Sequence, residues 1–161
     1  MSWPIWAGDI PTWITTAAVG FAGAQLLVDR RRRAAEENRE AKAQASKLSA
    51  WAVSDRNAVP LAFGVVVSNR SVSTFHNVSI VAKIHKKQIA SEIHFEVLPP
   101  GEFFVELANG EWEFAVEANE HGRMLRPYTR TEGYRVLSIG FTDNLDQRWS
   151  ADAHMVLRRA G

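Results

Sequence analysis

The side chains that could hold a metal ion or move a proton are five histidines and a short acidic run in this chain of 161 residues. No two histidines have the spacing of a metal-binding pair on a helix or strand. They are His76, His85, His94, His121 and His154. The run Asp143, Asn144 and Asp146 has calcium-binding residue types, but it lacks the alternate spacing, the central glycine and the terminal glutamate of a calcium loop. We therefore expect a turn there and no metal site.

Sequence motifs for nucleophilic catalysis and nucleotide binding are absent. The chain has no G-x-S-x-G elbow, no Walker A loop and no Rossmann glycine fingerprint. It also has no cysteine, which excludes disulfides and thiolate metal sites. The sequence therefore predicts a protein that is not an enzyme and needs no cofactor. Another hypothesis is an enzyme that uses scattered residues such as His121 and Asp143.

One cluster combines basic and aromatic residues, and one strip is acidic. Guanidinium groups bind phosphates and carboxylates through paired hydrogen bonds, so the cluster could contact an anion or a partner. Its members are Arg123, Arg126, Tyr128, Arg130 and Arg135. The acidic strip comprises Glu102, Glu106, Glu111, Glu113 and Glu117. Either the two groups pair with each other, which needs no partner, or the strip is a solvated sheet face or a docking face for a basic protein.

The elements that must position these groups have the period-2 pattern of β-strands. Apolar and polar residues alternate in runs separated by Gly, Pro, Asn and Asp, and Asn109-Gly110 is a strong hairpin signal. The expected strands are 61–69, 78–84, 93–97, 103–107, 112–118, 134–142 and 147–153, with a long loop at 119–133. About seven short strands predict an immunoglobulin-like antiparallel β-sandwich over residues 51–161, and a small barrel is the alternative.

The opening of the chain has the pattern of a membrane-spanning helix. Ile10 to Val28 carry no charge and would span about 28 Å as a helix, close to the thickness of a bilayer core. Residues 1–28 contain no Lys or Arg, and a basic run follows Asp29. The positive-inside rule then places the N-terminus outside and the remainder in the cytoplasm. The expected membrane-anchoring residues are Trp3, Trp6, Trp13, Arg30, Arg31, Arg32 and Arg33.

Two other interpretations of this opening segment stay open. A signal peptide would need its basic residues ahead of the apolar core, and here they follow it. A helix buried in a soluble oligomer fits a segment that is only just long enough and rich in small residues. Gly20 and Ala24 form a small-xxx-small pair that would allow a homodimer through this helix.

Residues 29–50 are rich in Ala, Glu, Lys, Arg and Gln and predict a linker helix. Ala34, Ala41 and Leu48 recur every seven residues, so the helix is either a solvated spacer or a thin dimer stalk. We therefore divide the chain into a tail and transmembrane helix (1–28), a basic linker helix (29–50) and a β-sandwich (51–161). The sandwich holds twelve basic and thirteen acidic residues, a balance that argues against nucleic-acid binding.

Several short segments resemble those of small actinobacterial single-pass membrane proteins of unknown function. They are Ile10–Thr16, the run Arg30–Arg33 into Ala34-Ala35-Glu36-Glu37, Ser68-Asn69-Arg70-Ser71, Leu98-Pro99-Pro100-Gly101, and Phe141-Thr142-Asp143 followed by Arg148-Trp149. The resemblance implies an N-terminal helix and a cytoplasmic β-rich domain, and it implies no catalytic residues.

The sequence as a whole predicts a β-sandwich tethered to the cell membrane that binds or scaffolds another protein. Its partners would be the lipid bilayer and an unknown protein. The alternative is a soluble structural or assembly protein whose apolar N-terminal helix is buried in a homo-oligomer.

Overall fold

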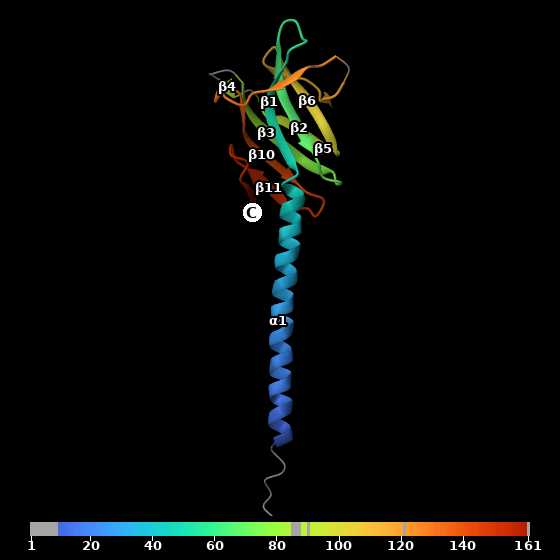
Figure 1. Cartoon of the computed structure of the whole chain (residues 1–161), viewed down its shortest axis with the longest axis vertical. Coiled ribbons are helices and arrows are strands. Elements are labelled where there is room, and N and C mark those ends of the chain that lie inside the picture. The colour runs from blue at the N-terminus through green and yellow to red at the C-terminus, as the bar shows by residue number, and fades with distance from the viewer. Residues whose placement is uncertain (1–9, 85–87, 90, 121, 161) are drawn as a thin grey trace, which may run out of the picture. The chain divides into compact units, whose positions relative to one another are not determined.

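The structure is a computed structural model that describes residues 10–84, 88–89, 91–120 and 122–160, without the side chains of residues 10–20, 22, 88 and 89. The chain divides into two compact units, one ending at Ala41 and one beginning at Lys42. Figure 1 shows helix α1, Ile10–Ala45, followed along the chain by strands. Trp3 and Trp6 lie outside the described residues, and Trp13 lies on α1.

Helix α1 covers the predicted span and most of the predicted linker, but it ends five residues before the predicted boundary. The chain leaves the helix in a tighter turn, in which the Lys47 amide donates to the carbonyl of Gln44, three residues earlier, at 3.1 Å. Strand β1, Leu48–Asp55, begins directly afterwards. Leu48 is buried in the β-rich unit, so the seven-residue repeat that ends there is not a coiled-coil seam. The linker therefore ends earlier and the β-rich unit begins earlier than predicted.

The exposed face of α1 includes large apolar side chains. Phe21 is 68% exposed, Leu26 62% and Leu27 59%. All four residues Arg30–Arg33 are exposed. Among the described residues, no helix is both long enough and apolar enough to cross a membrane.

The β-rich unit consists of two antiparallel sheets. The first sheet has the order β7-β6-β2-β1-β9, with β8 also on β6. Besides β1 it contains β2 (Ala62–Asn69), β6 (Gly101–Ala108), β7 (Glu111–Trp112), β8 (Val116–Glu117) and β9 (Leu125–Pro127).

The second sheet has the order β12-β11-β10-β3-β4, with β5 also on β3. It contains β3 (Phe75–Ile84), β4 (Gln88–Ile89), β5 (Ile93–Leu98), β10 (Arg135–Thr142), β11 (Arg148–Ala151) and β12 (Leu157–Arg159). The described residues thus form twelve strands rather than about seven, because five of the twelve have only two or three residues.

Rows of paired residues across each sheet form the core. In the first sheet Ala52 pairs with Val65, which pairs with Val105, and all three are buried. In the second sheet the buried row is Ile93, Ile80 and Ile139. Side chains at paired positions point to the same face of a sheet, so each row presents one continuous apolar surface. Two such sheets give a sandwich-like arrangement.

A second apolar cluster lies on the other face of the first sheet. Val53, Val66, Phe104 and Ala118 are buried there, with Trp51, Val116 and Leu125 packed against them. The ring of Phe104 lies directly over Gly64, where a Cβ atom would approach ring carbons to 2.6 Å and the Val105 carbonyl oxygen to 2.2 Å. A glycine is therefore required at position 64 by close packing.

The predicted strands at 61–69, 93–97, 103–107 and 134–142 are confirmed by β2, β5, β6 and β10. The hairpin at Asn109-Gly110 is confirmed too, since both residues have positive φ, 53° and 86°. Strands β1, β4, β9 and β12 lie outside every predicted strand. Strand β9 lies inside the predicted loop 119–133 and ends at Pro127 on a sheet edge, where a residue without an amide donor is tolerated.

We expect Gly64→Ala to lower the free energy of unfolding of the β-rich unit by about 1–3 kcal/mol, because the new methyl group overlaps Phe104 and the β6 backbone. Urea unfolding of the full chain in a mild detergent, followed by tryptophan fluorescence, measures this change. The matched control is Gly23→Ala on α1, where an added Cβ meets nothing within 4 Å. Equal unfolding midpoints for Gly64→Ala and the unmodified chain would contradict the packing argument.

Candidate binding sites

The structure divides the predicted arginine and tyrosine cluster. Arg126, Tyr128 and Arg130 line one cavity of about 780 Å³. The described residues that line it with them are Ser54, Arg56, Leu61, Pro127, Thr129 and Thr131. We call this cavity the arginine pocket. Arg123 and Arg135 do not line it. Arg123 instead lies 5.0 Å from the ring centroid of Phe104, and Arg135 begins β10 opposite Lys83.

Strand alternation explains why these residues meet. Arg126, Tyr128 and Arg130 are two residues apart, as are Ser54 and Arg56. Ser54 pairs with Arg126, and the Tyr128 amide extends this ladder by donating to the Ala52 carbonyl at 3.0 Å. Paired residues share a face, so Ser54 and Arg126 project to the same side of the sheet, and Arg56, Tyr128 and Arg130, which follow the two strands, line the same cavity. The strand pairing therefore brings Ser54 and Arg56 to residues some seventy positions later in the sequence.

A stack of three aromatic rings includes Tyr128 and joins the two sheets. Tyr128 and Tyr134 have ring centroids 4.4 Å apart, and Phe63 of β2 lies 5.5 Å from Tyr134. Phe63 belongs to the first sheet, and Tyr134 directly precedes β10 of the second. Burial raises the pKa of the Tyr134 phenol above its usual value of 10.0, and the neighbouring Tyr128 raises that pKa further.

The predicted pairing between the arginine cluster and the acidic strip does not occur among the described residues. Their ion pairs join Arg70 to Glu102 at 3.4 Å and Arg123 to Glu120 at 3.9 Å. Glu120 is not a member of the strip, and Arg70 is not a member of the cluster. Arg123 of the cluster and Glu102 of the strip are thus paired with residues outside the two groups, and the described structure shows no ion pair between the groups.

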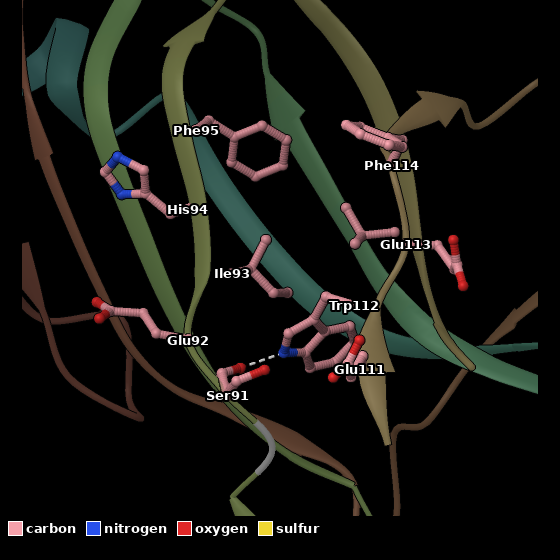
Figure 2. Close-up of a pocket in the computed structure, with 11 residues that line it drawn as sticks. Ser91, Glu92, Ile93, His94, Phe95, Glu111, Trp112, Glu113 and Phe114 are labelled. Carbon is pink, nitrogen blue, oxygen red and sulfur yellow. Dashed lines mark hydrogen bonds between the residues drawn. The ribbon is translucent and has the colours of Figure 1, made fainter. Parts of the chain in front are cut away.

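A second cavity, of about 590 Å³, lies between strands of the two sheets (Figure 2). Ile93 and Phe95 come from β5, while Trp112 and Phe114 come from β7 and the segment after it. Figure 2 shows Glu92 and His94 pointing away from Ile93 and Phe95, and His94 is exposed as the alternation predicts. The Trp112 indole donates a hydrogen bond to the Ser91 carbonyl, which connects the two sides.

The lining of this second cavity is acidic and partly aromatic. Its charged residues are Glu92, Glu111 and Glu113, and the described residues that line it include no lysine or arginine. Two of these three belong to the predicted acidic strip. We call this cavity the acidic groove.

A β-bulge makes Phe114 project from the protein. Trp112 pairs with Leu107, and Val116 pairs with Phe104. The segment from Trp112 to Val116 therefore has one residue more than the segment of β6 that it faces. The extra residue breaks the uninterrupted alternation expected for 112–118, as a bulge does. Trp112 and Val116 are consequently half-buried, whereas Phe114 is 94% exposed. The strand predicted over 112–118 is therefore interrupted, and Trp112 and Val116 lie on opposite faces of the sheet, as do their partners Leu107 and Phe104.

The buried polar residues that could do chemistry are used to hold the fold. One carboxylate oxygen of Asp143 accepts from the amides of Leu145 and Gln147, and the other accepts from the Trp149 indole at 2.8 Å. Asp55 accepts from the Asn57 and Met124 amides at 3.0 Å. The turn predicted at 143–146 is confirmed as a hydrogen-bonded turn.

Asn69 is a third buried polar residue with a structural role. Its amide donates to the carbonyls of Ser73 and Leu98, and its oxygen accepts from the Ser71 amide and hydroxyl. These four hydrogen bonds fix the connection from β2 to β3, which passes from one sheet to the other.

Among the described residues, no group of three His, Asp or Glu side chains is placed to hold a metal ion. His85 and His121 lie outside the described residues. The local sequence pattern does not identify Ser54 and Arg56 as site residues, because their place there depends on pairing with β9, which lies inside the predicted loop 119–133. The alternation Arg126-x-Tyr128-x-Arg130 is the signal that points to this strand.

Family models, curated proteins and solved structures were compared with this chain, and none of the three comparisons finds a match. The resemblance to small actinobacterial membrane proteins therefore stays a prediction.

We expect Tyr128→Phe to lower the pKa of Tyr134 toward 10.0 without reaching it, because the charge of one phenolate is removed while burial remains. The raised pKa means that the folded state favours the neutral phenol. Its stabilising contribution is therefore present below the unfolded pKa and is lost as the pH rises through the folded pKa. Alkaline titration of phenolate absorbance measures the change, since the chain has only two tyrosines. A Tyr134 pKa that does not move in Tyr128→Phe would refute the coupling.

Proposed function

We propose that this chain is a membrane-tethered, non-enzymatic module that binds another protein through the acidic groove, with its β-sandwich in the cytoplasm. The observation that carries the proposal is Phe114, a large aromatic side chain that is 94% exposed beside a cavity whose lining residues include Glu111 and Glu113. Exposed aromatic groups on an otherwise polar rim are typical of protein interaction sites.

The strand edges beside the groove fit an extended partner segment. Within the described part of the chain β5 pairs only with β3, and residues 113–115 belong to no strand. Unpaired backbone amides and carbonyls at such edges accept an added strand from another chain. Glu92, Glu111 and Glu113 favour a partner with positive charge. The proposed occupant is therefore an extended segment of another protein in which basic residues flank an apolar one.

The finer fold assignment belongs to the same proposal. The order β1-β2-β6 in one sheet parallels strands A-B-E of an immunoglobulin-like sandwich, and β11-β10-β3 in the other parallels G-F-C. Such sandwiches carry binding surfaces on their edges and loops, which agrees with the position of the groove.

The absence of catalysis is supported by what the buried polar groups do. The polar side-chain atoms of three buried residues form hydrogen bonds within turns and strand connections. These residues are Asp143, Asp55 and Asn69. A catalytic acid or base must instead reach a substrate proton.

The membrane tether is supported by charge order and by exposed apolar side chains on α1. The uncharged segment Ile10–Val28 is followed by Arg30–Arg33, and Phe21, Leu26 and Leu27 are more than half exposed. Lipid would cover these side chains, with the arginines at the cytoplasmic surface. A second copy of the helix would also cover them, which is the basis of the alternative proposal of a soluble homo-oligomer.

We expect alkaline washing of native membranes to leave the chain in the membrane fraction, because a spanning helix is held by hydrophobic burial. The double variant Ala18→Asp with Phe21→Asp should move to the soluble fraction, since each central charge costs about 2.5–3.5 kcal/mol in a bilayer. Ala35→Asp, at an exposed helix position outside the uncharged segment, is the matched control. Release of the unmodified chain as a soluble oligomer would support the alternative instead.

We expect the full chain to bind a short probe peptide of alternating lysine and valine and to reject one of alternating glutamate and valine. Phe114→Ala should weaken lysine-valine peptide binding by about tenfold or more, because it removes the exposed anchor. Leu145→Ala is the control, since Leu145 is also exposed, at 72%, but lies in the 143–146 turn. Isothermal titration of the detergent-solubilised protein measures both. Equal affinity for the two peptides, or equal effects of the two variants, would refute the groove as the binding site.

A further inference from the structure

We propose that the arginine pocket binds a dianionic phosphate monoester. This pocket is formed by β1, β9 and the segment after β9, whereas the acidic groove is formed by β5, β6 and β7, so the two sites share no lining residue. The proposal does not depend on the function assigned to the groove.

The charge of the pocket is strongly positive and uncompensated. Arg56, Arg126 and Arg130 line it, and none of its described lining residues is acidic. Within the described part of the chain, none of these three arginines is in ion-pair contact with a carboxylate. Three guanidinium groups around one cavity repel one another, and a dianion removes that repulsion.

The nearest carboxylate along β1 is directed elsewhere. Asp55 lies between Ser54 and Arg56, so strand alternation places its side chain on the opposite face of the sheet. There it is buried and accepts hydrogen bonds from the Asn57 and Met124 amides. Asp55 therefore holds the loop after β1 and does not neutralise the pocket.

Hydroxyl groups complete a set of donors. Ser54 is only 4% exposed, lines the pocket, and its hydroxyl makes no hydrogen bond to another described residue. Among the described residues no fully buried side-chain oxygen or nitrogen lacks a partner, so the Ser54 hydroxyl is reached from the pocket and is free to donate to a ligand. The Thr131 hydroxyl oxygen accepts from the Gly133 amide at 3.1 Å, so its own proton is left to be donated. Phosphate oxygens accept hydrogen bonds from both kinds of donor.

The backbone under these side chains is fixed before any ligand arrives. Ser54 and Arg126 are paired in the sheet, and the Arg56 amide donates to the Met124 carbonyl at 3.0 Å. Tyr128, which forms part of the wall, is held by its stack on Tyr134. Only the outer ends of the arginine side chains must be ordered on binding, which reduces the entropic cost.

Phosphate fits these observations better than a single carboxylate does. Its second negative charge matches the excess of guanidinium groups, and its several oxygens can accept from arginines and hydroxyls together. Two sources present this group, a free phosphorylated small molecule and the headgroup of a phosphorylated lipid. Both would use the same residues of the pocket.

The test is an amide chemical-shift titration of the full chain in neutral detergent micelles, with glycerol phosphate as the soluble probe. We expect saturable shifts at residues 126–131 and a loss of affinity of about tenfold or more in Arg126→Gln with Arg130→Gln. Ser54→Ala should weaken binding by a smaller factor. Arg135→Gln, an exposed arginine near the pocket that does not line it, is the matched control and should change affinity less than about twofold.

A second arm distinguishes the two sources of phosphate. Phosphatidylinositol 4-phosphate is added to the micelles and compared with phosphatidylcholine. Tighter binding of the phosphorylated lipid than of glycerol phosphate, with the same loss in the double arginine variant, assigns a lipid headgroup. Equal or weaker lipid binding assigns a soluble phosphate ester. The absence of saturable shifts at 126–131 with both probes, or equal weakening by Arg135→Gln, would overturn the proposal.

Discussion

The register of β1 between β2 and β9 is the constraint on which the two sheets and the arginine pocket depend. The pairing of Ala52 with Val65 sets the buried row of the first sheet, and Ser54 pairs on the same face with Phe63 and Arg126. A slip of one residue would exchange the two faces of β1, so that Trp51 and Val53 would take the places of Ala50 and Ala52 in the buried row of the first sheet. Core packing therefore fixes the register, and the register in turn places the hydroxyl of Ser54 beside the guanidinium groups.

The interior of the β-rich unit uses its polar residues for connections rather than for chemistry. Asn69 holds the passage from one sheet to the other, and Asp143 links a tight turn to Trp149. Buried polar groups need partners within the protein, and these residues find them nearby. Groups that remain available to ligands consequently lie near the surface, at a bulged sheet edge and at the end of β9.

A nearly neutral domain thus presents two regions of opposite charge. The acidic groove lies between β5 and β7, and the arginine pocket lies between β1 and the segment after β9. Among the described residues the two regions do not neutralise each other, since the recorded ion pairs involve Arg70 with Glu102 and Arg123 with Glu120. Net charge alone hides this separation, because it sums over charges that the fold keeps apart.

The sequence by itself determined the strand-rich class, the Asn109-Gly110 hairpin and the extended helix of the opening segment, because period-2 alternation, positive-φ residues and helix propensity act locally. It also placed Arg126, Tyr128 and Arg130 in one basic and aromatic cluster, together with Arg123 and Arg135. Only the tertiary structure decided that β1 starts at Leu48, that Arg123 lies over the Phe104 ring and not in the arginine pocket, and that Phe114 projects outward. Each of these depends on pairing between distant strands, and a register shift of one residue is invisible to a local pattern.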